Sequence, residues 1–260
     1  MQTPESLFIH EVGHGPAVVL LHGSPSSVAF FEPLVTALQS HRRVLIPELP
    51  GYGQSPPLAG PRLFERTQEL LEEALRARGV TQAAVVGFSL GSWRALRLAL
   101  TGRLEVTQVV TLGGFAALAP EHRDALRATA DMLQRMPDFT DPAFRRPVAL
   151  NFMAPAFASA HPEAVSEVEA WLDSTTPAWL SIEALSTANV EDLHPRLGSL
   201  RAPLTARVGE LDRSTPPAYS ERMVAAAPHA VLQRVPGCAH ALLLEDREGT
   251  VAALRAALDA

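Results

Sequence analysis

The chain has 260 residues, of which 47% are hydrophobic and 19% are charged, so it is long enough and apolar enough to bury a large core. The net charge is −6, and all 22 basic residues are arginines scattered along the chain, which argues against binding to nucleic acid or to an anionic membrane. With one cysteine, Cys238, and no lysine, the sequence excludes an intramolecular disulfide, a cysteine-based metal cage and Schiff-base catalysis by lysine.

The sequence carries no sign of a membrane or secretory segment. No stretch approaches the apolar length that a membrane-spanning helix needs. The segment from Met1 to Glu11 lacks the basic flank and the apolar run of a secretory signal. We therefore expect a soluble, cytoplasmic protein that has no membrane partner.

Short apolar, β-branched runs alternate with longer segments of helical period in the first half of the chain. This alternation predicts strands that are joined by crossover helices, and hence a largely parallel sheet. The predicted strands are 17–21, 43–46, 83–87 and 107–112, and the predicted helices are 30–38, 63–78 and 90–100.

The alternation stops after Gly113 and Gly114. From residue 116 to residue 193 there is no strand-like run, but amphipathic stretches separated by prolines predict a helical insertion, namely 120–136, 163–172 and 177–188. Strands at 204–208 and 231–235 and helices at 217–226 and 247–258 then complete the pattern. We expect a core of residues 1–115 and 194–260, with residues 116–193 forming a helical cap.

The segment Gly87-Phe88-Ser89-Leu90-Gly91 fits the pattern G-x-S-x-G. It lies between a predicted strand and a predicted helix, which is the setting that a nucleophile elbow requires. Glycines at these positions allow a sharp turn close to a neighbouring strand, and the start of the helix directs free N–H groups toward the serine. The alternative is a glycine-flanked serine that only caps the helix.

Several motifs in one order resemble the α/β-hydrolase superfamily, in its cap-bearing branch. The sequence L-L-H-G-S ends at Ser24, and residues 47–55 read P-E-L-P-G-Y-G-Q-S, with glutamate where the family commonly has aspartate. The elbow at Ser89, the segment 209–212 and the segment 237–240 follow. The resemblance implies an α/β-hydrolase fold, with a mostly parallel central sheet flanked by helices and an inserted helical cap.

Family order also implies a catalytic triad of Ser89, Asp212 and His240. A serine hydroxyl needs a base within hydrogen-bond reach, and that base needs a buried acceptor to orient it. His240 and Asp212 each follow a late predicted strand, so both lie at the carboxyl edge of the sheet, where such folds bind ligands. The alternatives are a surface histidine and, because Glu210 is close by, an exposed turn aspartate.

The resemblance assigns the oxyanion hole to the backbone N–H groups of Ser24 and Leu90, and His22 is expected to brace this loop. No cofactor and no metal is expected. The segment from His10 to His14 matches the zinc-protease pattern H-E-x-x-H, but Gly13 interrupts it and predicts a turn between two strands instead of the helix that this metal site needs.

Aromatic and apolar residues of the insertion could shape a substrate pocket, and Phe152, Met153 and Trp179 are the candidates. The alternative is that these side chains form the core of the cap itself. We predict a serine hydrolase that acts on a small-molecule ester, thioester or lactone through an acyl-enzyme. Carbon–carbon bond hydrolysis, peroxidase-like use of the same triad and a non-catalytic small-molecule receptor stay open as alternatives.

Overall fold

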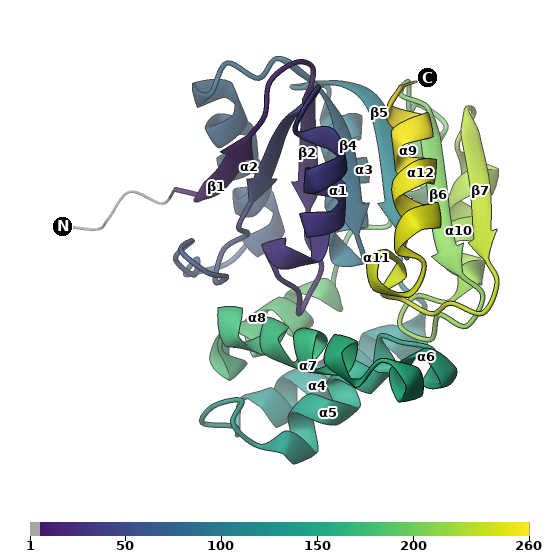
Figure 1. Ribbon diagram of the computed structural model, residues 1–260. Helices are drawn as coiled ribbons and strands as arrows, with labels where there is room; N and C mark the ends of the chain where they lie inside the picture. The colour runs from purple at the N-terminus through teal and green to yellow at the C-terminus, as the bar shows by residue number, and fades with distance from the viewer. Residues whose placement is uncertain (1–5, 260) are drawn as a thin grey trace.

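The computed structural model describes residues 6–259 and consists of one mixed sheet flanked by helices, with a group of further helices at one end (Figure 1). Residues 1–5 and 260 belong to the predicted core segments, and residues 1–5 also belong to the segment inspected for a secretory signal. They lie outside the described residues.

Seven strands form the sheet in the order β1-β3-β2-β4-β5-β6-β7. They are β1 (Ile9–Val12), β2 (Ala17–Leu21), β3 (Arg43–Pro47), β4 (Gln82–Phe88), β5 (Glu105–Leu112), β6 (Leu204–Gly209) and β7 (Ala230–Val235). All neighbouring pairs are parallel except β1 with β3, so the predicted mostly parallel sheet is confirmed. The carboxyl ends of β2 to β7 therefore meet at one edge, and the loops that follow these strands lie close together.

Alternate side chains of the buried strands pack against different faces of the sheet. Val19 and Val85 belong to the cluster that includes the apolar side of α2 (Leu63–Ala77), α3 (Leu90–Thr101) and α10 (Pro217–Ala226). Val18 and Val86 belong to the cluster that includes α1 (Glu32–Leu38) and α12 (Arg247–Leu258), which lie side by side in Figure 1. Burial on both faces explains why these strands are almost wholly apolar.

The predicted helix 30–38 is divided in the structure. A 3-10 turn, η1 (Val28–Phe31), precedes α1, which begins at Glu32. Pro33 accounts for this boundary, because proline lacks an N–H group and fits only the first turn of an α-helix.

Between β5 and β6 the chain forms helices without a strand, all of it within the described residues. They are α4 (Pro120–Leu133), α5 (Pro142–Asn151), α6 (Pro155–Ala160), α7 (Pro162–Trp171), η2 (Leu172–Ser174), α8 (Pro177–Thr187) and α9 (His194–Leu197). Helices α4 to α8 each begin with a proline, at the position where a missing N–H costs nothing. They lie together at one end of the sheet (Figure 1).

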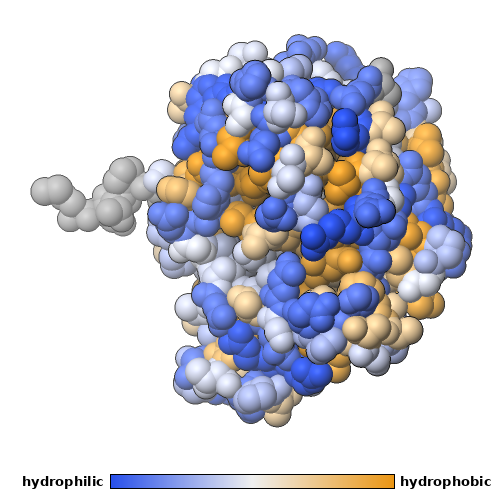
Figure 2. Space-filling view, in the orientation of Figure 1, coloured by the Kyte–Doolittle hydropathy of each residue, from blue (hydrophilic) through white to orange (hydrophobic). Residues whose placement is uncertain are grey.

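None of the helices in residues 6–259 is long and apolar enough to cross a bilayer. On the face shown in Figure 2, hydrophilic and hydrophobic residues are interspersed. The cytoplasmic location stays a prediction.

Candidate active site

Ser89 lies directly between β4 and α3, on a strained turn with φ 54° and ψ −122°. Non-glycine residues rarely adopt a positive φ, so the surrounding structure must enforce it. Glycines on either side allow the required close approach: a Cβ on Gly91 would lie 2.0 Å from the carbonyl oxygen of Leu21, and one on Gly87 would lie 2.3 Å from that of Gly91. The backbone N–H of Ser89 also donates to the carbonyl of Leu112 in β5, at 2.9 Å. The turn is thus fixed by its neighbours on both sides.

His240 and Asp212 form a buried pair at the carboxyl edge of the sheet. Nδ1 of His240 lies 2.7 Å from Oδ2 of Asp212, and both side chains are fully buried. An ionised carboxylate can only accept, so Nδ1–H of His240 is the donor and Nε2 keeps its lone pair. Within residues 6–259, Nε2 has no hydrogen-bond partner, and His240 lines the same cavity as Ser89. This arrangement leaves a base available to a serine hydroxyl.

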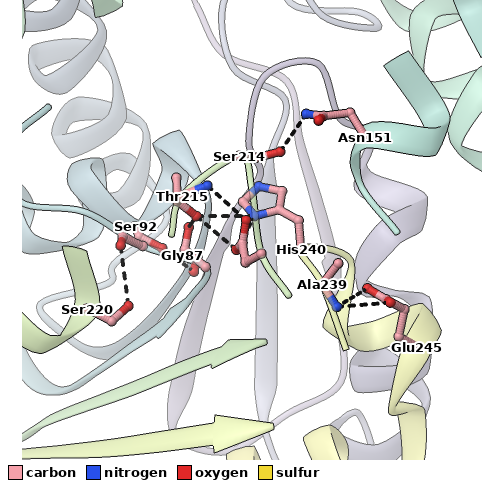
Figure 3. Close-up of polar contacts among 12 residues, drawn as sticks. Gly87, Ser92, Asn151, Ser214, Thr215, Ser220, Ala239, His240 and Glu245 are labelled. Atoms are coloured by element: carbon pink, nitrogen blue, oxygen red, sulfur yellow. Dashed lines mark hydrogen bonds and ion pairs between the residues drawn. The ribbon is translucent and has the colours of Figure 1, made fainter. Parts of the chain in front are cut away.

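Thr215 is a third member of this group that sequence reasoning missed (Figure 3). Its backbone N–H donates to Oδ1 of Asp212 at 2.8 Å. Its hydroxyl donates to the carbonyl of Gly113 at 2.7 Å and lies 3.1 Å from Oδ2 of Asp212 and 3.2 Å from Nδ1 of His240. The one sequence signal for this contact is the position of Thr215 three residues after Asp212, because an aspartate side chain often accepts a hydrogen bond from a backbone N–H shortly after it.

Gly113 makes room for the same pair. It has φ +53°, and a Cβ added to it would lie 2.7 Å from Nδ1 of His240 and 3.0 Å from Oδ2 of Asp212. A side chain at this position would therefore compete with the His–Asp hydrogen bond for space.

The loop after β2 lies against the serine. A Cβ on Gly23 would lie 2.8 Å from Cβ of Ser89, and Ser24 and Leu90 both line the cavity beside Ser89. His22 holds this loop: its Nδ1 lies 2.9 Å from the carbonyl oxygen of Gly23, and its Nε2 accepts from the backbone N–H of Leu49 at 3.0 Å. These partners fit one neutral tautomer with the proton on Nδ1.

Burial lowers the pKa of His22 to about 4, so the ring is neutral at physiological pH. His22 is therefore suited to hold the loop and unsuited to carry a proton in the reaction.

A buried polar network lies behind Ser24. The hydroxyl of Tyr52 donates to Oε2 of Glu183 at 2.5 Å and lies 3.1 Å from Oγ of Ser24. Nη2 of Arg94 lies 3.5 Å from the other oxygen of Glu183, and both side chains are almost fully buried. Burial and the negative charge of Glu183 raise the pKa of Tyr52 well above its usual value, so the phenol keeps its proton.

Glu183 lies in α8, between β5 and β6, whereas Arg94 lies in α3, so the network links α8 to the helix that follows Ser89. No local pattern in the sequence indicated this network.

The cavity beside Ser89 has a volume of about 330 Å³. Its lining is mostly apolar, and much of it comes from α4, α5 and α8, as the residues Leu126, Leu133, Phe144, Val148, Leu180 and Ala184 show. Of the three predicted lining residues, only Phe152 is among those that line it. Met153 is fully buried. Trp179 packs on Gly51, since a Cβ added to Gly51 would lie 2.3 Å from the indole ring. Both side chains are buried, and neither lines this cavity.

The segment that matches H-E-x-x-H does not form a helix. His10 lies in β1, and its Nε2 is 2.8 Å from Oε1 of Glu48. Gly13 has φ +78°, which ends the strand in a turn. Within residues 6–259, no group of three or more His, Cys, Asp or Glu side chains could hold a metal ion.

Comparison with known proteins identifies relatives of this chain. A pimeloyl-[acyl-carrier protein] methyl ester esterase of Xanthomonas campestris is 31% identical over 260 aligned residues, which cover 95% of this chain and 97% of the relative. One from Vibrio vulnificus is 39% identical over 111 residues, or 43% of this chain and 42% of the relative. Polyketide synthase ThaQ of Burkholderia thailandensis is 30% identical over 95% of this chain, which spans only 12% of that much longer protein.

Solved structures agree on the fold. A hydrolase from Pseudomonas aeruginosa superimposes with a TM-score of 0.89 at 22% identity, covering 100% of this chain and 97% of the other. A thermophilic esterase from Thermogutta terrifontis gives 0.86 at 23% identity, covering 96% and 91%. A family model for the alpha/beta hydrolase fold matches residues 16–247. This chain therefore belongs to the α/β hydrolase fold family.

Proposed function

We propose that this protein is a serine hydrolase that cleaves a carboxylic ester through an acyl-enzyme intermediate, with Ser89 as nucleophile. One observation carries the proposal: Ser89 and His240 line one cavity, and His240 is paired through Nδ1 with Asp212 while its Nε2 has no hydrogen-bond partner within the described residues. This is the division of roles that serine hydrolysis requires.

In the proposed reaction, Oγ of Ser89 attacks the ester carbonyl carbon while Nε2 of His240 takes the hydroxyl proton. The C–O bond to the alcohol then breaks, and His240 returns the proton to the departing oxygen. Water attacks the acyl-enzyme in the same way, with His240 again as base, and releases the acid. Asp212 stabilises the imidazolium, and the backbone N–H groups of Ser24 and Leu90 stabilise the oxyanion.

Residues 116–193 act as the cap in this proposal, because their helices supply most of the cavity lining. A cavity of about 330 Å³ is at the small end for ligand pockets, and its apolar lining suits an acyl chain of moderate length. Two of the named relatives are methyl ester esterases, so methyl esters of such acyl groups are the first substrates to test. Carbon–carbon bond hydrolysis, peroxidase-like chemistry and a receptor role are not favoured by these relatives.

Labelling with a fluorophosphonate probe tests the proposal. We expect the intact mass of the native protein to increase by one adduct and that of Ser89→Ala to stay unchanged, because only an activated serine attacks the phosphorus. A folded native protein that takes up no adduct and hydrolyses no acyl ester would contradict the proposed function.

A further inference from the structure

His122 and Tyr219 form a second polar position in the cavity, apart from the proposed triad. His122 lies in the first turn of α4 and lines the cavity, and Tyr219 lies buried in α10. The Tyr219 hydroxyl oxygen is 2.6 Å from Nδ1 of His122 and accepts a hydrogen bond from the backbone N–H of Ala119 at 3.0 Å. Tyr219 therefore holds one edge of the His122 ring.

These contacts select the tautomer of His122. A phenol has one hydrogen to donate, and within residues 6–259 the Tyr219 hydroxyl meets no acceptor other than Nδ1 of His122. Nδ1 is then the acceptor, so in the neutral ring the proton is on Nε2. Nε2 has no hydrogen-bond partner within the described residues, and His122 is only half-buried. The donor that His122 supplies to the cavity is therefore its Nε2–H group.

The charge of the cavity lining has one sign. Arg213 lines the cavity, is exposed, and has neither an ion pair nor a side-chain hydrogen bond within residues 6–259. The lining includes no aspartate and no glutamate. Arg213 lies in the loop that leads from β6 into α10, the helix whose Tyr219 contacts His122, and both Arg213 and His122 line the cavity. An anion in this cavity would meet donors and a positive charge, and no carboxylate among the lining residues.

We propose that His122 and Arg213 bind a carboxylate of the substrate, so that the preferred substrate is an ester that bears a carboxylate in addition to the ester group that is cleaved. This inference rests on the proposed ester hydrolysis at Ser89. Moving an ionised group from water into an apolar cavity costs much free energy unless hydrogen-bond donors and an opposite charge replace the water. Hydrogen bonds that involve a charged group are stronger than those between neutral groups. A site with such donors selects strongly between a ligand that has the matching group and one that lacks it.

Two methyl esters of equal chain length test this selectivity. Monomethyl adipate carries a carboxylate where methyl hexanoate carries a methyl group. We expect the native protein to hydrolyse monomethyl adipate with the higher kcat/KM. Arg213→Gln and His122→Phe should each reduce the ratio of the two kcat/KM values by about tenfold or more, as expected for the loss of a hydrogen bond to a charged group. His122→Gln, which retains an N–H donor, should reduce the ratio less than His122→Phe.

Arg201→Gln is the matched control, because Arg201 is an exposed arginine before the start of β6, at the opposite end of that strand from Arg213. It should leave the ratio unchanged, since it alters the net charge without altering the cavity. A native preference for methyl hexanoate, or a ratio that Arg213→Gln and Arg201→Gln lower equally, would overturn the inference.

A second measurement does not depend on turnover. Calorimetric titration of Ser89→Ala with the same two esters should give tighter binding of monomethyl adipate, and adding Arg213→Gln should remove the difference. If this binding preference is present but the native protein hydrolyses neither ester, the proposed function fails and the carboxylate site stands. If both esters are hydrolysed and the binding preference is absent, the carboxylate site fails alone.

Discussion

The carboxylate of Glu245 accepts a hydrogen bond from the backbone N–H of Ala239 at 3.0 Å, immediately before His240 (Figure 3). The same carboxylate accepts from the backbone N–H of Ala154 at 2.8 Å, between α5 and α6. The carbonyl of Phe152 in turn accepts from the backbone N–H of His240 at 3.1 Å. The loop that carries His240 and the segment between α5 and α6 are therefore held together as one unit, and Glu245 is the side chain that joins them.

We expect Glu245→Gln to lower kcat for an acyl ester by about tenfold while the protein stays folded, because a small displacement of a catalytic group has a large effect on rate. The amide has one acceptor oxygen in place of two, and its NH₂ group would face a backbone N–H. Steady-state kinetics and thermal unfolding check this together. Glu248→Gln, at an exposed position of α12, is the matched control. A kcat within twofold of the native value would show that His240 does not depend on this contact.

Thr215→Val should lower kcat by about three- to tenfold, because the variant removes a hydroxyl that contacts both Asp212 and His240 and so weakens the orientation of the imidazole. Thr215→Ser keeps the hydroxyl and should restore most of the activity. The comparison of kcat for the three proteins, at equal folded fraction by circular dichroism, is the measurement. Equal loss in the serine and valine variants would assign the effect to the methyl group and to packing.

Glu183→Leu should lower the free energy of unfolding by about 3–5 kcal/mol, because it leaves the buried guanidinium of Arg94 without its carboxylate. Arg94→Met alone should also destabilise. The double variant should lose less than the sum of the two single losses, because it removes both buried charges. Urea denaturation of the native protein, the two single variants and the double variant gives the double-mutant cycle. Strict additivity would mean that the two charges do not interact in the folded protein.

The burial of His22 predicts a pH dependence of stability. Its pKa is about 4 in the folded protein and near 6.5 when exposed, so between these values the unfolded chain binds more protons. This contribution to stability is complete above pH 6.5 and is lost as the pH falls toward 4; the full difference corresponds to about 3 kcal/mol. Urea denaturation across this range should show the loss, and His22→Asn should show a smaller slope. An identical slope in both proteins would assign the loss to other groups.

Local pattern was enough to predict the parallel strands β2 to β7 and the sharp turn at Ser89. The strands read as β-branched apolar runs because both faces of the sheet are covered, and the glycines around Ser89 mark a turn that no larger residue could form. Placing Asp212 and His240 at one edge needed only the rule that parallel strands end on the same side. Their catalytic roles stay a prediction that labelling and mutation will test.

The contacts that hold and shape the site depended on tertiary structure. By sequence, Phe152 and Met153 are equal candidates for the cavity lining. In the structure, the backbone of the His240 loop donates hydrogen bonds to the carbonyl of Phe152, and the Phe152 side chain lines the cavity whereas Met153 is buried. Glu183 lies in the predicted helix 177–188 and Glu245 lies just before the predicted helix 247–258, and neither was singled out, because a carboxylate carries no local sign of the partner it will meet. Which partner it meets is decided by how helices distant in sequence pack on the sheet, and periodicity along the chain does not specify that packing.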